Sequence, residues 1–508
     1  MPYFLTLDVG TTSLKACLFS EALELQAVAH VEYALESSGA TVECDPEVYW
    51  HSLVRGVGEI LPIAGPDPEI LAVSITTQGE TLIALSDKSQ TLGKAIVWLD
   101  ARAEQEAAAL RQILPPDRYY RATGMTGIWG TTPLAKLCWL RDHQPEDYAR
   151  TRRYLLLSDY LVWRLTGVEA TEATMMASTG YYHIYERRIW TEALELAGVD
   201  PAKIPPVKNS GDISGLLLPE AARALGLPAG IPVLIAGNDQ ICGQVGSGNL
   251  SPGLLTETTG TALTTVAVLA RDSIPPQPLF DVCLHANGSY LVLQYTQTAA
   301  ILLKWFKDNF CIEEQSRAKA LGCSVYDLLG DLAQTVPPGS DGLLLYPHFE
   351  GKNAPDPVPE ARGAAVGLTL GMGKAHFVRA IMESIAYMLR ENVEHLRRQG
   401  IVIDRIRSLG GGSGSPIWQQ IKADVLGLEL ETLQCPEAAS LGCAIGAAVT
   451  LGLFPDLEAA CGQAVRIKNH TAPDPGCPDY DPFYRSYLRM DDHLRRFYQT
   501  ERQEKGSE

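Results

Sequence analysis

The opening stretch YFLTLDVGTTSLKACLFS (residues 3–20) decides the fold. Its two halves, residues 3–9 and 14–20, have the composition and alternation of β-strands. Between them, Gly10-Thr11-Thr12-Ser13 is a turn sequence rich in hydroxyl groups. A carboxylate, Asp8, lies at the end of the first strand. We therefore expect the chain to begin with a β-hairpin whose turn carries hydroxyl groups beside an acid.

The same pattern of strand, Gly-Thr turn and strand occurs again in the second half of the chain. A strand at residues 254–257 is followed by the turn Thr258-Thr259-Gly260-Thr261 and a strand at residues 262–269. Two matches of this length suggest an internal duplication. We place the boundary near residue 245, which predicts two domains, residues 1–245 and 246–508.

Mixed α/β patterns fill the rest of the chain. Asp45-Pro46 combines an N-cap with a proline in the first turn, which predicts a helix start. The pattern predicts further strands at residues 71–76, 95–98, 231–236 and 406–409, and helices near residues 101–113, 134–142, 159–165, 374–398 and 438–451. The fold class is therefore α/β.

Size, charge and cysteine usage narrow the class of protein. A chain of 508 residues exceeds the size at which one core stops growing, and 46% hydrophobic with 20% charged residues is ordinary for a globular protein. The formal net charge of −18 argues against nucleic-acid binding. The eleven cysteines include no CxxC pair, which favours free thiols in a reducing compartment. No signal peptide and no apolar stretch of about 20 residues is present, so we expect a cytoplasmic protein without a membrane partner.

Three glycine-containing loops are candidates for ligand binding, two of them for phosphate. In Asp8 to Lys15, a strand-end carboxylate, a glycine and hydroxyl groups can hold a phosphate chain and Mg²⁺, although an ordinary hairpin turn has the same composition. Residues 258–261 offer a second such loop. The run Gly410 to Ser415 lies between a strand and a helix, so its backbone can approach a flat ligand. Ser415 stands where the dinucleotide-binding motif GxGxxG has its last glycine, and residues 371–375 lack the spacing of a P-loop. The sequence therefore disfavours both a dinucleotide-binding fold and a P-loop fold.

Polar residues after other strands are candidates for catalysis and sugar binding. Asp239 follows a buried strand, where a carboxylate can accept the proton of an attacking hydroxyl or can instead cap a helix. The segments Gln78-Gly79-Glu80 and Trp98-Leu99-Asp100-Ala101-Arg102 combine hydrogen-bonding groups with an indole face, as sugar sites do. Asp100 is also compatible with a helix cap, and Arg102 with a solvated position.

These motifs, in this order, resemble the FGGY carbohydrate kinases of the actin, hexokinase and Hsp70 superfamily. The resemblance runs from Asp8 through Trp98, Asp239, Gly260 and the glycine loop to the C-terminal helices. Two further segments resemble signatures of the family, residues 133–143 and residues 363–383. The resemblance implies two ribonuclease-H-like, actin-like ATPase domains flanking a catalytic cleft, with sugar mostly on the first and ATP mostly on the second.

The resemblance also implies roles for individual residues. Asp239 would be the general base, and Asp8 would help to place Mg²⁺. The ATP-binding residues would be Thr11, Thr12, Lys15, Thr259, Gly260, Thr261, Gly411, Gly412 and Ser415. The sugar-binding residues would be Gln78, Glu80, Trp98, Asp100, Arg102, Asp239 and Gln240.

The substrate is predicted less closely than the reaction. Glu80 and Asp239-Gln240 favour the glycerol kinase type, whereas the segment from Trp98 to Arg102 favours the ketose kinases. Gly79 lacks a side chain and is expected to leave room for a ligand larger than glycerol. Our hypothesis is a five-carbon ketose, D-xylulose first, with glycerol, other polyols and other ketoses as alternatives. An actin-like or Hsp70-like ATP-driven binding protein is the alternative from another class, and a homodimer is compatible with the family.

Overall fold

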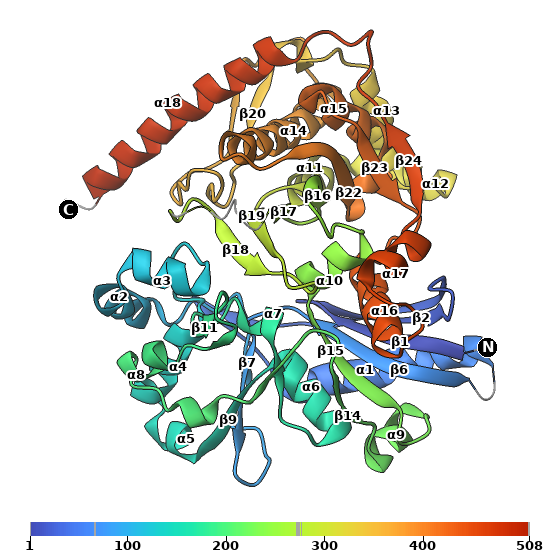
Figure 1. Cartoon of the computed structure of the whole chain (residues 1–508). Coiled ribbons are helices and arrows are strands. Elements are labelled where there is room, and N and C mark those ends of the chain that lie inside the picture. The colour runs from blue at the N-terminus through green and yellow to red at the C-terminus, as the bar shows by residue number, and fades with distance from the viewer. Residues whose placement is uncertain (1, 66–67, 271–274, 276, 506–508) are drawn as a thin grey trace. The chain divides into compact units, whose positions relative to one another are not determined.

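The computed structural model describes residues 2–65, 68–270, 275 and 277–505. The chain, whose elements are labelled in Figure 1, divides into two compact units. Unit 1 comprises Met1–Leu250, Ile274–Val292 and Glu437–Arg466, and unit 2 comprises Ser251–Ser273, Leu293–Pro436 and Ile467–Glu508. A single cut near residue 245 does not reproduce this division. The physical reason is that helices α16 (Ala438–Thr450) and α17 (Leu457–Ala464), late in the sequence, pack with elements of unit 1.

Unit 1 is built on a six-stranded sheet in the order β14-β15-β6-β1-β2-β3. The strands are β1 (Pro2–Val9), β2 (Ser13–Ser20), β3 (Leu25–Glu32), β6 (Glu69–Thr77), β14 (Ile213–Leu216) and β15 (Pro232–Asn238). The first three form the predicted antiparallel hairpin and its continuation. Strand β6 runs parallel to both β1 and β15, so these three strands end at the same edge of the sheet.

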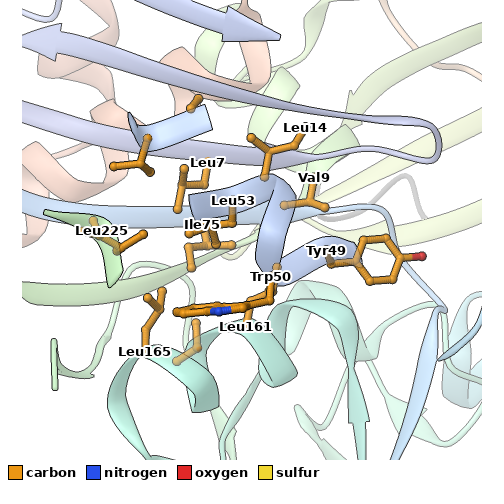
Figure 2. Close-up of a cluster of buried hydrophobic side chains, with 14 of the residues drawn as sticks. Leu7, Val9, Leu14, Tyr49, Trp50, Leu53, Ile75, Leu161, Leu165 and Leu225 are labelled. Carbon is orange, nitrogen blue, oxygen red and sulfur yellow. The ribbon is translucent and has the colours of Figure 1, made fainter. Parts of the chain in front are cut away.

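Apolar side chains from this sheet form a core with three helices, α1 (Pro46–Ile60), α6 (Leu157–Thr166) and α9 (Pro219–Leu225). Helix α1 starts as predicted, with the Asp45 side chain accepting a hydrogen bond from the backbone N–H of Glu47. Figure 2 shows Leu7, Leu53 and Leu161 gathered in this core. Full burial of one such side chain contributes roughly 1.5–3 kcal/mol, so the core holds the sheet edge rigidly.

Helix α10 (Asp239–Gly246) begins where β15 ends and packs closely on α16. A Cβ atom at Gly246 would lie 1.8 Å from the Ala438 carbonyl oxygen, and one at Gly442 would lie 1.9 Å from the Cys242 carbonyl oxygen. Only glycine allows the two backbones to come this close. Since α16 also packs on β1 and β6, the first turn of α10 is fixed relative to the sheet edge.

A second sheet of unit 1 has the order β4-β5-β8-β7-β9. Its strands are β4 (Glu36–Ser38), β5 (Thr41–Cys44), β7 (Leu82–Ser86), β8 (Ala95–Ile96) and β9 (Thr151–Leu156). Further helices of unit 1 are α2 (Glu104–Ile113), α3 (Pro116–Thr123), α4 (Pro133–His143) and α7 (Ala173–Met176). The predicted strand at residues 95–98 ends early and the helix predicted from residue 101 begins at Glu104, because the residues between them form an irregular segment.

In unit 2 the strands run in the order β17-β16-β22-β23-β24. Their bounds are β16 (Gly253–Thr259), β17 (Leu263–Leu269), β22 (Ile403–Leu409), β23 (Leu430–Leu433) and β24 (Ile467–Thr471). The main helices are α11 (Ala300–Phe310), α12 (Ile312–Leu321), α13 (Val325–Gln334), α14 (Lys374–Arg398), α15 (Pro416–Leu426) and α18 (Asp481–Lys505). Of the helices in the described part of the chain, none combines the length and apolarity needed to cross a membrane.

Candidate active site

Three segments far apart in sequence meet at one edge of the six-stranded sheet. In the strand register, Val9 lies opposite Thr77, and Thr77 lies opposite Asn238. The backbone N–H of Gln78 donates to the Val9 carbonyl at 2.9 Å and continues this alignment beyond the strand end. The predicted residues that follow β1, β6 and β15 are therefore neighbours.

Asp239 is the first residue of α10, but it is not the residue that caps the helix. The cap is Asn238, whose side-chain oxygen accepts from the Gln240 N–H at 2.9 Å. Asp239 Oδ1 accepts from the same N–H at 2.7 Å. The carboxyl is half-buried, and burial together with the nearby Asp8 raises its pKa to about 7. A carboxyl poised near neutral pH is suited to act as a general base.

A glycine allows the backbone turn that precedes Asp239. Gly237 has φ +122°, and a Cβ atom there would lie 2.5 Å from the Thr174 hydroxyl oxygen. The same hydroxyl donates to Glu172 at 2.7 Å and accepts from the Asn238 N–H at 3.1 Å. The turn is thus held by a buried glutamate on the other side, which sequence reasoning had not singled out.

Asp8 lies half-buried near the end of β1. Burial raises its pKa to about 6, although Lys15 opposes this effect. Among the described residues, none donates a hydrogen bond to the Asp8 carboxylate, whereas Lys15 Nζ is held by Glu437 at 2.6 Å. A desolvated carboxylate without a hydrogen-bond donor fits a hard divalent cation, so the residues present are compatible with the Mg²⁺ implied by the family.

The first hairpin turn is tied to the predicted sugar-binding segment. Trp98 Nε1 donates to the Thr11 hydroxyl at 3.0 Å. Thr12 is exposed, and its carbonyl accepts from the Tyr33 N–H at 2.9 Å. The turn therefore has one hydroxyl engaged in the protein and another facing solvent, with the indole beside them.

Glu80 adopts a left-handed conformation, with φ +62° in a non-glycine residue. Such backbone strain is concentrated at functional sites. Burial raises its pKa to about 7, and the charge of Lys136 and the nearby Ser178 hydroxyl oppose this effect. Burial also lowers the pKa of Lys136 to about 8.

Lys136 was not predicted as a site residue. It lies on α4, its side chain is fully buried, and Nζ donates to the carbonyls of Val97 at 2.9 Å and Trp98 at 3.4 Å. The signal available in the sequence was a lysine inside the apolar run PLAKLCWL (residues 133–140). Such a lysine is rarely buried without a specific partner.

Asp100 and Arg102 bind each other. Arg102 Nε and Nη2 donate to the two Asp100 oxygens at 2.8 and 2.7 Å, and the Val42 N–H donates to Asp100 at 2.6 Å. Arg102 also donates to Glu43 at 2.6 Å and lies over the Trp139 ring. Asp100 therefore does not cap a helix, and Arg102 is not solvated. The two side chains bind each other and hold the segment after Trp98 in place.

The space beside Gly79 is not open, contrary to the expectation from sequence. A Cβ atom at Gly79 would lie 2.7 Å from the Asn238 side-chain nitrogen and 3.4 Å from the Ser178 hydroxyl oxygen. The absent side chain thus accommodates Asn238. The other two predicted sugar contacts differ in exposure, since Gln78 is buried and Gln240 is half-buried.

In unit 2, the two predicted nucleotide loops lie against each other. A Cβ atom at Gly412 would lie 2.7 Å from Thr259 Cγ2, so the glycine loop packs directly on the Gly-Thr turn. The carbonyls of Gly260 and Thr261 accept from the first N–H groups of α11 at 2.8 and 2.9 Å. Gly411 is exposed, and the Ser415 N–H closes the loop by donating to the Gly412 carbonyl at 3.4 Å.

Comparison with known proteins identifies the family. Family models for the N-terminal and C-terminal domains of the FGGY family of carbohydrate kinases match residues 3–246 and 257–451. The gluconokinase of Bacillus subtilis is 26% identical over 98% of this chain and 97% of its own length. The autoinducer-2 kinase of Escherichia coli K12 is 30% identical, covering 93% and 91%. The crystal structure of xylulose kinase from Rhodospirillum rubrum superposes with a TM-score of 0.87 at 27% identity, covering 98% and 100%.

The predicted fold class is confirmed by these likenesses, whereas the cleft between the domains stays a prediction. Family members transfer phosphate from ATP to a sugar hydroxyl, which removes the alternative of a binding protein that phosphorylates nothing. This chain belongs to the FGGY family of carbohydrate kinases.

Proposed function

We propose that this kinase phosphorylates a ketopentose such as D-xylulose, with ATP as donor and Asp239 as general base. The observation that carries the assignment of the base is the position of Asp239, at the end of a parallel strand with a pKa raised to about 7. At that pKa, a sizeable fraction of the carboxyl is ionised at neutral pH and can accept a proton.

In the proposed reaction, Asp239 takes the proton of a sugar hydroxyl, and the resulting alkoxide-like oxygen attacks the γ-phosphorus of ATP in line. The bond from the γ-phosphorus to the oxygen that bridges the β- and γ-phosphates breaks, and ADP leaves with that oxygen. Backbone N–H groups of the Gly-Thr turns and the hydroxyls of Thr11, Thr12 and Thr261 bind phosphate oxygens. Asp8 would hold Mg²⁺, which neutralises phosphate charge when bound. The loop from Gly411 to Ser415 would bind the adenosine.

The charges around the sheet edge support an uncharged sugar. Glu80 and Asp239 present acceptor oxygens suited to hydroxyl donors, and Asp8 is a further acid at this edge. The three neighbouring cations are each engaged by protein groups: Lys15 by Glu437, Lys136 by backbone carbonyls, and Arg102 by Asp100 and Glu43. A carboxylate such as that of gluconate would meet like charges there, so we favour a ketose even though gluconokinases are among the relatives. Glycerol or another polyol is the second candidate, because Glu80 stands where the glycerol type has an acid.

The test is ADP release with MgATP across D-xylulose, D-ribulose, L-ribulose, L-xylulose, glycerol, erythritol, xylitol and gluconate. We expect one neutral sugar to stimulate wild-type turnover and Asp239→Asn to lower kcat by about 10²- to 10⁴-fold. Asp87→Asn makes the same chemical change at an exposed aspartate and serves as the control. Strong turnover of gluconate would contradict the ketose assignment, and equal activity of Asp239→Asn would contradict the base.

A further inference from the structure

A fully buried ion pair lies beneath the Gly-Thr turn of unit 2. Glu257 on β16 and Lys422 on α15 are both 0% exposed, and Lys422 Nζ lies 2.6 Å from Glu257 Oε1. Lys422 also donates to the Thr259 hydroxyl at 2.8 Å, and that hydroxyl donates to the second Glu257 oxygen at 2.6 Å. The pair thus binds the last residue of β16 before Gly260 through its side chain.

The same glutamate is connected to the glycine loop. The Ser408 hydroxyl, on β22, donates to Glu257. Gln419 Nε2, on α15, donates to Ser408 Oγ at 3.0 Å and to the Gly412 carbonyl at 3.2 Å. A continuous chain of buried hydrogen bonds therefore runs from the Gly-Thr turn to the glycine loop.

The corresponding hairpin of unit 1 folds without such a pair. When the Gly-Thr turns are aligned, Leu7 of β1 takes the position of Glu257, and Leu7 is fully buried in an apolar core. Burying two charges carries a desolvation penalty, and replacing such a pair by apolar residues is often neutral or stabilising. The hairpin itself therefore does not need Glu257 or Lys422 to form.

We infer that the Glu257–Lys422 pair is a positioning device for nucleotide binding. It fixes Thr259 and, through Ser408 and Gln419, the backbone of Gly412, so that both loops hold the geometry that phosphates and adenosine need. Lys422 acts through these groups, since its side chain is wholly enclosed. The inference rests on the proposed use of these loops for ATP.

The decisive experiment replaces both charges together. Glu257→Leu with Lys422→Met keeps similar volume, so we expect a folded protein with a melting temperature equal to or above that of the wild type. We expect its Kd for ADP, measured by calorimetry without sugar, and its KM for ATP to rise about 10-fold or more. The Kd for the sugar should stay within about 2-fold, because its proposed contacts lie in unit 1. A double variant that binds ADP as the wild type does overturns the inference.

A matched control separates positioning from general stability. Lys352 is also 0% exposed in unit 2, and it is bound by Glu391 at 2.9 Å and Asp491 at 3.1 Å. Lys422→Met and Lys352→Met should both lower the melting temperature, since each takes a buried cation away from the carboxylates that it binds. Only Lys422→Met should weaken ADP binding. Equal weakening by Lys352→Met, or no ADP binding by the wild type, would overturn the inference, whereas failure of every sugar to be phosphorylated would count against the proposed function instead.

Discussion

At the residue scale, one carboxyl group at the sheet edge influences another. Burial is the largest cause of the raised pKa of both Asp8 and Asp239, and the charge of Asp8 adds to the effect on Asp239. The pKa of the proposed base, Asp239, therefore lies close to neutral pH because of where the fold buries it and which acid lies beside it.

The pH dependence of catalysis follows from this pair. We expect kcat/KM for the sugar to rise with pH and to have its midpoint near pH 7, as Asp239 loses its proton. Asp8→Asn removes a neighbouring negative charge, so the pKa of Asp239 and the midpoint should shift to lower pH, in addition to any loss of rate. Initial rates between about pH 5.5 and 9 check this, and an unshifted midpoint would contradict the coupling.

The raised pKa of Asp239 also predicts how the stability of the fold depends on pH. The pKa of Asp239 rises from 3.8 to about 7 on folding, so the native state retains a proton that the unfolded state loses between these values, and stability falls as pH rises through that window. Asp239→Asn should therefore stabilise the protein at pH 8, by roughly 1–2 kcal/mol after allowance for partial solvent exposure. Urea unfolding at pH 8 and pH 4 tests this, with no gain expected at pH 4. An equal gain at both pH values would show that ionisation is not the cause.

At the scale of elements, the crossing of α10 and α16 holds the turn that carries the proposed base. Gly442→Leu would place a Cβ atom 1.9 Å from the Cys242 carbonyl oxygen, so the helices must separate. We expect destabilisation by about 3 kcal/mol and a loss of kcat, because α10 carries Asp239.

A control lies one turn away on the same helix. A Cβ atom added at Gly446 would have no neighbouring atom within 4 Å among the described residues, so Gly446→Ala should be stabilising by about 0.5–1 kcal/mol. Thermal unfolding of both variants provides the measurement. Similar effects from the two substitutions would mean that the close approach of the helices is unimportant.

Elements with strong local signals were predictable from sequence. Both Gly-Thr hairpins, the start of α1 at Pro46 and the full length of α14 follow from strand alternation, capping and helical periodicity. The contacts within the site were harder to predict from the sequence. Distant segments must meet before Arg102 can bind Glu43, Asp100 can bind the Val42 N–H, and Lys136 can bind the Trp98 carbonyl, and no local pattern encodes such a meeting.

At the scale of the whole molecule, unit 1 is completed by a segment from the last quarter of the chain. Residues 437–466 supply α16 and α17, and α16 packs on β1, β6 and α10. A domain boundary placed from the duplicated hairpins misses this segment. The duplication shows where each sheet begins along the chain, but it does not show which later helices pack on the first sheet.

Removing that segment should prevent unit 1 from folding. We expect residues 1–250 alone to expose the apolar surface that α16 covers, and to be cleaved rapidly in limited proteolysis. Adding residues 437–466 as a separate peptide should restore protection at least in part. A fragment of residues 1–250 that resists protease and unfolds cooperatively would contradict this view.

The same feature has a consequence for synthesis on the ribosome. Residues 251–436 must be translated before α16 and α17 emerge, which at about 5–20 residues per second takes on the order of 10–40 s. During that interval the nascent first half contains every strand of its main sheet but lacks the last helices that cover the sheet. Chaperones that recognise exposed apolar surface would bind this kinase as an incomplete nascent chain, before it can bind a sugar.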